Sequence, residues 1–404
     1  MLFLMINSSL LTFFCGLWKQ SLRNSFSFFA EHREYNNSVN WEYGEQSILS
    51  IASSVRKHFG LEAFSPSNPT LDRWMNDNRF DCVVLFLVDA MGTAILKKHL
   101  PMNAFLLQNL NQELISVFPT ATTAATTAVR TGRTPGETGW FGWCQYFEEH
   151  HDLIIPFLSK GKYSEKSYGR SYCETVLPLR LTVDELNEAG IPATSVWPSW
   201  GAPNPCDDIS SVMDKVIELA GTKRFRHIYA YWDLLDTIMH RNGTCSLQAR
   251  EETLRINQLF EQFAAALPKG TGVIITADHG QLDVRNIDLR TYPDLLACLN
   301  HLPSMEARFM AFSVKPEAKE RFCSLFESCL GKDFLLLPSE EQIDAGLFGK
   351  GKDHSHYLGD FIACSKTDAR LALTDSSMNV VGDHGSFLDD EKMIPMILVD
   401  NALQ

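Results

Sequence analysis

Short apolar runs alternate with amphipathic helical patterns along most of this 404-residue chain, and this alternation limits the fold more than any other feature. From residue 81 onward, runs of five or six apolar residues are separated by segments with a helical period. Such runs are typical of buried parallel strands, which need crossover helices between them. The sequence therefore predicts an α/β fold, with a mostly parallel central sheet and helices on both faces.

The expected elements can be placed by residue number. Strands are predicted at 83–88, 113–117, 193–197, 227–231, 273–277 and 396–399, and helices at 45–59, 122–131, 182–189, 208–220 and 247–266. Residues 291–375 break the alternation with a shorter mixture of strands and helices, which indicates a small inserted α+β lobe. The remainder, 41–290 and 376–404, is the expected catalytic core.

Residues 1–40 have no period, and their first eighteen residues are apolar without Lys or Arg before Lys19. A secretory signal normally begins with a basic region, and a membrane span needs about 20 apolar residues. We therefore expect a poorly ordered leader, or a start codon set too far upstream, in a cytoplasmic protein. A signal or membrane anchor is the alternative. The ten cysteines contain no CxxC pair, which favours reduced thiols in the core.

The net charge of −13 bears on the partners of the protein. An acidic surface repels the phosphates of duplex nucleic acid and anionic lipid. A phosphate-bearing small molecule would then need local positive charge, which bound metal ions can supply. The sequence carries no signal for an oligomeric state.

Acidic and imidazole side chains follow the predicted strands. Asp89 comes directly after VVLFLV, Asp278 and His279 follow VIITA, and His384 lies in a second DHG near the end of the chain. The carboxyl ends of parallel strands converge on one crevice, where α/β sheets place their sites. Each residue also has an ordinary interpretation, such as a helix N-cap for Asp89.

Asp236 and His240 are four residues apart in DLLDTIMH, so on a helix they share one face. They either bind the same ion or form a simple surface pair. Asp233 is a less suitable partner because it is seven residues from His240. Asp383, which precedes His384, is expected to orient an imidazole rather than to bind metal.

Thr122 begins the predicted helix in PTATTAATTAVRTG. A hydroxyl at a helix N-terminus lies near free N–H groups and the positive end of the helix dipole, which favour an alkoxide and a phosphoryl oxygen. The competing interpretation is a plain N-cap threonine on a helix of small residues that packs closely on the sheet.

The order of these motifs resembles the alkaline phosphatase superfamily, and most closely its type I phosphodiesterase/nucleotide pyrophosphatase branch. The resemblance covers 83–280 and 380–400, and none is assigned to 291–375. It implies two zinc ions, with manganese as the alternative. One ion would be bound by Asp236, His240 and His384. The other would be bound by Asp89, Asp278 and His279, with Thr122 as both nucleophile and ligand.

The chain departs from that branch directly after the nucleophile. Members of the branch have Thr-Phe-Pro-Asn there, whereas this chain has threonine, threonine and two alanines, so Ala125 replaces the asparagine. The backbone N–H of Thr123 is expected to contact the phosphoryl group instead. Thr138 in PGETG also stands where the branch has histidine. These differences leave the specificity for nucleotide diesters open.

The expected function is a metal-dependent hydrolase that cleaves phosphodiester or pyrophosphate bonds of a small organic phosphate through a phosphothreonine intermediate. Two divalent ions with three aspartates leave one net positive charge, which suits an anionic ester. The alternatives are a phosphomonoesterase or phosphonate hydrolase on the same core, and a metal-binding pseudoenzyme that serves as an interaction module. No sulfatase activation motif is present.

Two further segments each have two interpretations. The tryptophans of 140–143, with Trp197 and Trp200, either line a substrate pocket or pack in the core. GKGKDHSH at 349–356 is either a loop that touches substrate phosphate or a solvated connection.

Overall fold

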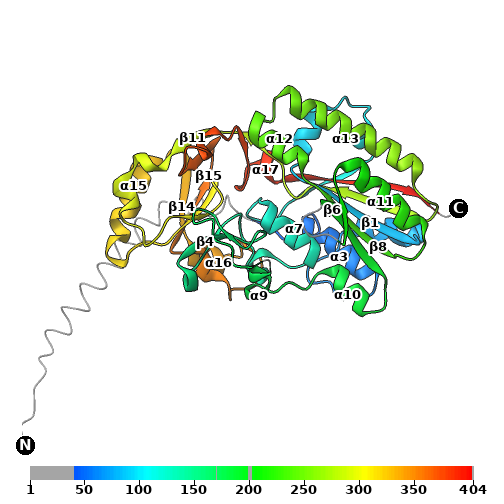
Figure 1. Cartoon of the computed structure of the whole chain (residues 1–404), viewed down its shortest axis with the longest axis horizontal. Coiled ribbons are helices and arrows are strands. Elements are labelled where there is room, and N and C mark those ends of the chain that lie inside the picture. The colour runs from blue at the N-terminus through cyan, green and yellow to red at the C-terminus, as the bar shows by residue number, and fades with distance from the viewer. Residues whose placement is uncertain (1–40, 170, 199–202, 403–404) are drawn as a thin grey trace, which may run out of the picture. The chain divides into compact units, whose positions relative to one another are not determined.

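The computed structural model describes residues 41–169, 171–198 and 203–402, of which Glu42 onward belongs to one compact unit (Figure 1). The predicted leader, 1–40, lies outside the described residues. None of the helices in the described part of the chain combines the length and apolarity of a membrane span.

A seven-stranded sheet forms the centre of this unit, in the order β2-β18-β9-β1-β8-β6-β7. Its strands are β1 (Cys82–Val88), β2 (Leu110–Ile115), β6 (Ala193–Pro198), β7 (Asn204–Cys206), β8 (His227–Trp232), β9 (Thr271–Thr276) and β18 (Met393–Asn401). Only β18 runs antiparallel to its neighbours β9 and β2. The predicted α/β fold with a mostly parallel sheet is confirmed.

The three central strands are buried along their whole length. Every residue of β1, β8 and β9 is buried, since helices cover both faces of the sheet. Helices α3 (Ile48–His58), α7 (Thr122–Thr131) and α10 (Thr182–Glu188) lie on one face, and α11 (Ile209–Gly221), α12 (Leu234–Asn242) and α13 (Leu247–Ala266) on the other (Figure 1). Both α7 and α13 have the bounds that the sequence predicts.

Local sequence explains where α7 begins and ends. Apart from Val129, its buried residues are alanines and threonines, which lets the helix pack closely beside α3. Gly132 follows its last residue with a φ of 74°, a left-handed conformation that glycine adopts without strain, and its N–H binds the carbonyl of Ala128. Thr122 is the first residue of this helix, and its side chain lies near His279, which follows the carboxyl end of β9.

Smaller elements complete the fold. They are α4 (Pro69–Asn78), α5 (Thr93–His99), α6 (Phe105–Gln108), α8 (Pro135–Thr138), α9 (Tyr172–Val176), α17 (Asp389–Lys392), and a three-stranded sheet of β3 (Gln145–Phe147), β4 (Asp152–Ile155) and β5 (Lys160–Gly161). Two short pairs join β10 (Leu282–Asp283) to β17 (Gly382–Asp383) and β11 (Arg285–Asp288) to β16 (Ala369–Ala372).

A second sheet occupies the segment that breaks the alternation. It is antiparallel, in the order β12 (Ser304–Met305), β13 (Phe309–Phe312), β15 (Phe361–Ser365) and β14 (Phe334–Pro338). The helices α14 (Pro293–Leu296), α15 (Lys319–Leu330) and α16 (Ser339–Asp344) accompany it, at the left of Figure 1. Because this region belongs to the same compact unit as the main sheet, the division into a core and an inserted lobe, 291–375, stays a prediction.

A buried ion pair ties Arg308, directly before β13 of this second sheet, to Glu391 in α17. The guanidinium of Arg308 binds the carboxylate of Glu391 through two hydrogen bonds of 2.8 and 2.9 Å, and both side chains are fully buried. Arg308 also donates to the carbonyls of Ala369 and Thr367, and Glu391 accepts from the N–H of Ser386. Every charged atom of the pair therefore has a partner, which a buried charge requires.

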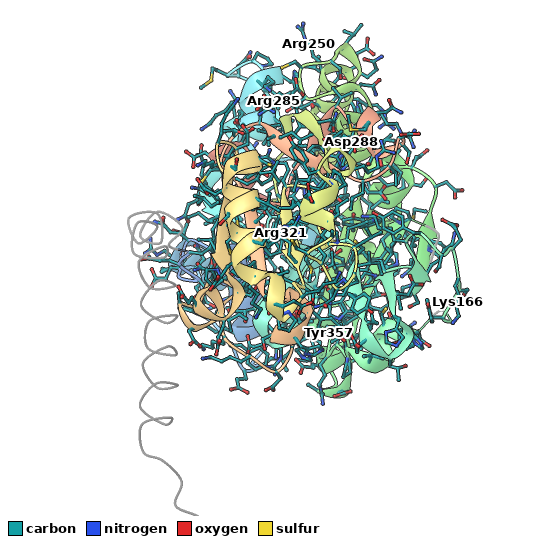
Figure 2. The ribbon with its side chains drawn as sticks, turned by 90° about the vertical axis from the view of Figure 1, so that its left-hand side faces the viewer. Lys166, Arg250, Arg285, Asp288, Arg321 and Tyr357 are labelled. Atoms are coloured by element: carbon teal, nitrogen blue, oxygen red, sulfur yellow. The ribbon has the colours of Figure 1, made fainter. Side chains whose placement is uncertain are left out.

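Replacing Arg308 with methionine should lower the free energy of unfolding by about 3–5 kcal/mol, because the Glu391 carboxylate would remain buried without its counter-ion. The matched control is Arg321→Met on α15, where the ion pair with Asp294 is solvent-exposed on the surface (Figure 2). That change should cost less than about 1 kcal/mol. Urea denaturation measures both, and equal losses for the two variants would contradict this account of the buried pair.

Candidate metal centre

Strand ends place three of the predicted residues together. Asp89 directly follows β1, and its N–H donates to the carbonyl of Trp232 at the end of the neighbouring strand β8. Asp278 lies just after β9, and its Oδ1 accepts the N–H of Ala90 at 3.1 Å. His279 comes next, with its Nε2 3.4 Å from Asp89 Oδ1 and 3.5 Å from Asp278 Oδ2. These three side chains are almost completely buried.

Helix α12 contributes the next two. Asp236 and His240 lie one turn apart, and the distance from His240 Nε2 to Asp236 Oδ1 is 3.3 Å. Both are partly exposed, in contrast to the first three residues. The i,i+4 spacing thus brings a carboxylate and an imidazole together, as the sequence predicts.

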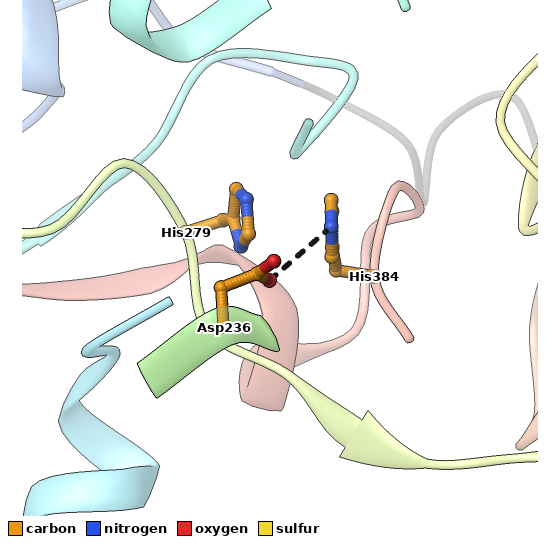
Figure 3. Close-up of side chains that lie close together, drawn as sticks. All are labelled: Asp236, His279 and His384. Atoms are coloured by element: carbon orange, nitrogen blue, oxygen red, sulfur yellow. Dashed lines mark ion pairs between the residues drawn. The ribbon is translucent and has the colours of Figure 1, made fainter. Parts of the chain in front are cut away.

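His384 follows β17 and completes the cluster. Its Nε2 lies 3.8 Å from Asp236 Oδ1, and its ring stacks on that of His279 at 3.6 Å between centroids. Figure 3 shows the Asp236 carboxylate facing His384, with His279 beside it. A loop that is more than a hundred residues away in sequence therefore joins the groups from β9 and α12.

The three imidazoles are held by the same kind of contact. The Nδ1 atom of each lies within hydrogen-bond distance of a backbone carbonyl: Gly280 for His279 (3.0 Å), Gly382 for His240 (2.7 Å) and Thr120 for His384 (2.8 Å). A proton on Nδ1 makes these bonds and leaves the lone pair of Nε2 free. Metal-binding histidines are commonly held in this way, so the three Nε2 atoms are prepared to bind a cation.

The three aspartates each have a buried oxygen without a hydrogen-bond partner among the described residues. These atoms are Asp89 Oδ1, Asp236 Oδ1 and Asp278 Oδ2. A buried carboxylate oxygen that lacks a partner is costly, and a coordinated cation removes that cost. Together with the inward Nε2 atoms, these oxygens form a donor set of carboxylate and imidazole that fits divalent metal.

The possible ligand atoms form three overlapping groups, and within each group all atoms lie within 4.8 Å of one another. The groups are Asp89, Asp278 and His279; Asp236, His279 and His384; and His240, Asp383 and His384. The first is one of the two predicted ligand sets. In the other predicted set, Asp236 Oδ1 lies close to both His240 and His384.

Charge crowding perturbs the pKa values of this cluster. Burial raises the pKa of Asp89 well above its ordinary value, with Asp278 and Asp236 adding to the effect. Burial also raises the pKa of Asp278 to about 6 and lowers those of His279 and His384 to about 4. For His240, burial opposes protonation, but Asp236 raises the pKa to about 10. Against the effect of burial, His240 in turn lowers the pKa of Asp236 below its ordinary value. Without metal, the negative charges of Asp89 and Asp278 are therefore disfavoured, and a divalent cation would balance them.

Thr122 adds a hydroxyl to the cluster. Its Oγ1 lies 3.1 Å from His279 Nε2, and the residue is only partly buried. As the first residue of α7, it lies beside backbone N–H groups that the helix itself does not satisfy. Thr123, whose backbone N–H is the expected phosphoryl contact, is the second residue of this helix.

A cavity of about 320 Å³ opens beside Thr122, Asp89 and Asp236. Its other walls are mostly aromatic or apolar: Trp143, Phe157, Leu158, Trp197, Tyr229 and Tyr231, with Thr126, Arg130, Asp233 and Thr237. Trp143 and Trp197 therefore line a cavity, whereas Trp140 is buried in the core and Trp200 lies outside the described residues. This size and lining suit a small organic molecule.

Several cavity residues were not predicted, although their spacing carries a signal. Thr126 and Arg130 follow Thr122 at intervals of four, so all three lie on one face of α7. Tyr229 and Tyr231 alternate on β8, and the Tyr231 hydroxyl donates to Asp89 Oδ2. Both patterns can be read from the chain once the nucleophile helix and β8 are recognised as neighbours.

The remaining candidates lie at the edge of the site or away from it. Asp383 binds the guanidinium of Arg370 at 2.5 Å and lies 3.8 Å from His240 Nδ1, and its role in orienting that ring stays a prediction. In the 349–356 segment, Lys350 donates to the carbonyl of Phe64 and Lys352 binds Asp344. Neither lysine lines the cavity.

A family profile described as type I phosphodiesterase / nucleotide pyrophosphatase matches residues 147–387, more than half of the chain. The chain belongs to this family. The matched range contains the five metal-site candidates from Asp236 to His384 and begins after Asp89 and Thr122. It also runs through 291–375, for which the sequence motifs alone indicate no relative.

Solved structures of similar fold include members of this family. Murine ectonucleotide pyrophosphatase / phosphodiesterase 5, an inactive threonine-to-alanine variant in complex with AMP, has a TM-score of 0.62 and 16% identity, covering 80% of this chain and 89% of that one. The human protein of the same name has a TM-score of 0.61, 17% identity, and coverage of 80% and 89%.

The fold is also that of a phosphonate-cleaving enzyme. Phosphonoacetate hydrolase from Sinorhizobium meliloti, in complex with phosphonoformate, has a TM-score of 0.59 and 12% identity, covering 78% of this chain and 89% of that one. At these identities the similarity shows a shared fold. No curated protein sequence matches the chain.

Proposed function

We propose that this protein is a metal-dependent hydrolase that cleaves phosphodiester or pyrophosphate bonds of a small organic phosphate, with Thr122 as nucleophile. The observation that carries the proposal is the donor set beside the Thr122 hydroxyl. Three buried carboxylate oxygens lack hydrogen-bond partners among the described residues, and the Nε2 atoms of three histidines lie between 3.3 and 3.8 Å from them. Membership of the phosphodiesterase family agrees with this chemistry.

In this proposal Asp89, Asp278 and His279 hold one divalent ion, and Asp236, His240 and His384 hold the other. Thr122 is close enough to His279 to share the first ion. When bound, such ions neutralise the ester, lower the pKa of a bound hydroxyl and stabilise the leaving oxygen. Imidazole with carboxylate favours zinc, and manganese is the alternative.

The chain itself supplies the nucleophile and its orientation. The Thr122 oxygen attacks phosphorus as its proton passes to solvent water, and the bond from phosphorus to the departing oxygen breaks with its electron pair on that oxygen. Water then hydrolyses the phosphothreonine and restores the hydroxyl. The N–H of Thr123, in the first turn of α7, would donate to a phosphoryl oxygen, a role that helix N-termini favour.

The cavity favours a substrate with an organic group on the phosphate. The aromatic walls next to Thr122 enclose space for an organic group of the substrate. A phosphate group alone would leave this part of the cavity empty. The complex of the murine neighbour with AMP supports a small phosphate-bearing partner, and its inactive threonine variant agrees with a threonine nucleophile. The shared fold with a phosphonoacetate hydrolase keeps phosphonate cleavage as the second candidate.

One assay separates these candidates. Purified protein with zinc or manganese should hydrolyse bis(4-nitrophenyl) phosphate faster than 4-nitrophenyl phosphate, and a chelator should abolish both activities. Re-addition of metal should restore them. A preference for the monoester would favour a phosphomonoesterase, and release of phosphate from phosphonoacetate would favour a phosphonate hydrolase. Absence of turnover on all of these esters, in protein that binds two metal ions, would indicate an interaction module instead.

A further inference from the structure

One cationic side chain in the cavity has no role in the proposed hydrolysis. Arg130 lies on α7, eight residues after Thr122 on the same helix face, and it is half-buried in the cavity wall. Among the described residues that line this cavity, it is the only lysine, arginine or histidine. The acidic lining residues, Asp89, Asp233 and Asp236, include two of the proposed metal ligands.

The guanidinium of Arg130 contacts rings rather than acids. Its central carbon lies 4.2 Å from the centre of the Trp197 ring and 6.0 Å from that of Tyr229. No hydrogen bond or ion pair to another described residue accompanies these contacts. The carboxylates of Glu174 and Asp184 act on Arg130 only at longer range, outside ion-pair distance.

The three arginines that are almost completely buried in the described part of the chain each bind a carboxylate directly. Arg56 lies 2.5 Å from Glu185, Arg308 lies 2.8 Å from Glu391, and Arg370 lies 2.5 Å from Asp383. Withdrawing a charge from water without a partner is costly, so these pairs are the expected arrangement. Arg130 departs from this arrangement, and it does so in the wall of the cavity beside Thr122.

Stacking on Trp197 also prepares Arg130 for an anion. A guanidinium that lies over a ring keeps the N–H groups at its edge available, in a planar fork that matches carboxylate or phosphate. Eight helical residues span about 12 Å, and arginine side chains on a helix lean back toward its N-terminus. An anion bound by Arg130 therefore lies within the length of a small molecule from the phosphorus attacked by Thr122.

We infer that Arg130 is a specificity residue for a second anionic group on the substrate. This inference rests on the proposed hydrolase function and narrows its substrate class. The substrate is a phosphodiester or pyrophosphate whose organic part ends in a carboxylate or a phosphate. The reacting phosphate lies at Thr122, the organic part lies along the aromatic wall, and the terminal anion binds the Arg130 fork.

Three synthetic esters test this inference in the wild-type protein. Each is a 4-nitrophenyl phosphodiester with the same three-carbon arm, ending in a carboxylate, a phosphate or a neutral carboxamide. We expect kcat/KM to be at least tenfold higher for one or both anionic arms than for the carboxamide. A factor of about ten corresponds to the lower end of the free energy that a hydrogen bond to a charged group usually contributes. The better of the two anionic arms identifies the terminal group.

Variants then show whether Arg130 causes the preference. In Arg130→Met the ratio of anionic to neutral kcat/KM should fall to about one, and Arg130→Lys should give an intermediate ratio because it keeps the charge but loses the fork. Arg250→Met, on the surface of α13, is the matched control and should keep the wild-type ratio (Figure 2). Thermal melting checks that each variant is folded.

The outcomes separate this inference from the hydrolase proposal. Equal hydrolysis of all three esters by wild-type protein, or a folded Arg130→Met variant that keeps the preference, would overturn the role of Arg130 while the hydrolase stands. If no ester is hydrolysed with either metal, the proposed function fails. Calorimetric titration of the three esters then still tests the role of Arg130. Equal affinities for the three arms would overturn that role, and tighter binding of an anionic arm would support it. If Arg130→Met does not fold, the wild-type ratio decides.

Discussion

Thr122→Ala is expected to reduce kcat on a phosphodiester by about 10⁴-fold or more, which is the scale seen when a nucleophile is removed. The substitution removes the only side chain that forms a bond to phosphorus in the proposal. It leaves the three aspartates and three histidines in place, so metal content should remain at the wild-type level. Steady-state kinetics and metal analysis of the same preparation measure the two quantities together.

Two further variants sharpen that test. Thr122→Ser keeps a hydroxyl at the start of α7 and should retain measurable turnover. Thr175→Ala makes the same chemical change on the exposed face of α9 and should behave as wild type. If Thr122→Ala turns over the diester at the wild-type rate, Thr122 is not the nucleophile, and water attack on the substrate becomes the simpler mechanism.

Asp278→Asn should weaken binding of one metal ion by at least about 100-fold and reduce turnover by a comparable or larger factor. Mutating residues that only support the ligands already costs 10–100-fold, and a direct ligand should cost more. Asp278 is fully buried, with Oδ1 bound to the Ala90 N–H and Oδ2 without a partner among the described residues. The amide has nearly the same shape but lacks the charge that a cation needs.

Metal analysis after dialysis should give two ions per chain for the wild type and one for Asp278→Asn. Asp288→Asn is the control, because that carboxylate lies at the end of β11 and binds Arg290 (Figure 2). It should keep both ions. An Asp278→Asn protein that still holds two ions with unchanged affinity would remove Asp278 from the ligand set.

Much of the fold could be predicted because the central strands are continuously apolar. The segments that became β1, β8 and β9 are buried on both faces, and burial of that kind leaves a clear signal in the sequence. The last strand, β18, is longer than predicted and starts at Met393. Pro395 lacks an N–H and argues against an interior strand, but here it pairs with Glu113 next to an irregularity at Met396 and Ile397.

The sequence could predict that the site residues lie close together, because most of them follow the ends of strands. Asp89 and Asp278 come after adjacent strands, and the spacing of Asp236 and His240 matches one helical turn. Their roles as ligands, and that of Thr122 as nucleophile, stay predictions. The helical spacing places Arg130 on the same face as Thr122, but its contacts could not be predicted, because only the folded chain shows that its guanidinium lies against Trp197 in the cavity rather than against an acid.

Anomalous X-ray scattering at the zinc edge, from crystals of zinc-loaded protein, tests the central proposal most directly. We expect two peaks in each molecule, one between Asp89, Asp278 and His279 and the other between Asp236, His240 and His384. If zinc-loaded crystals show peaks only outside this cluster, or no peak at either position, the proposal that these residues form a two-metal hydrolase centre is contradicted.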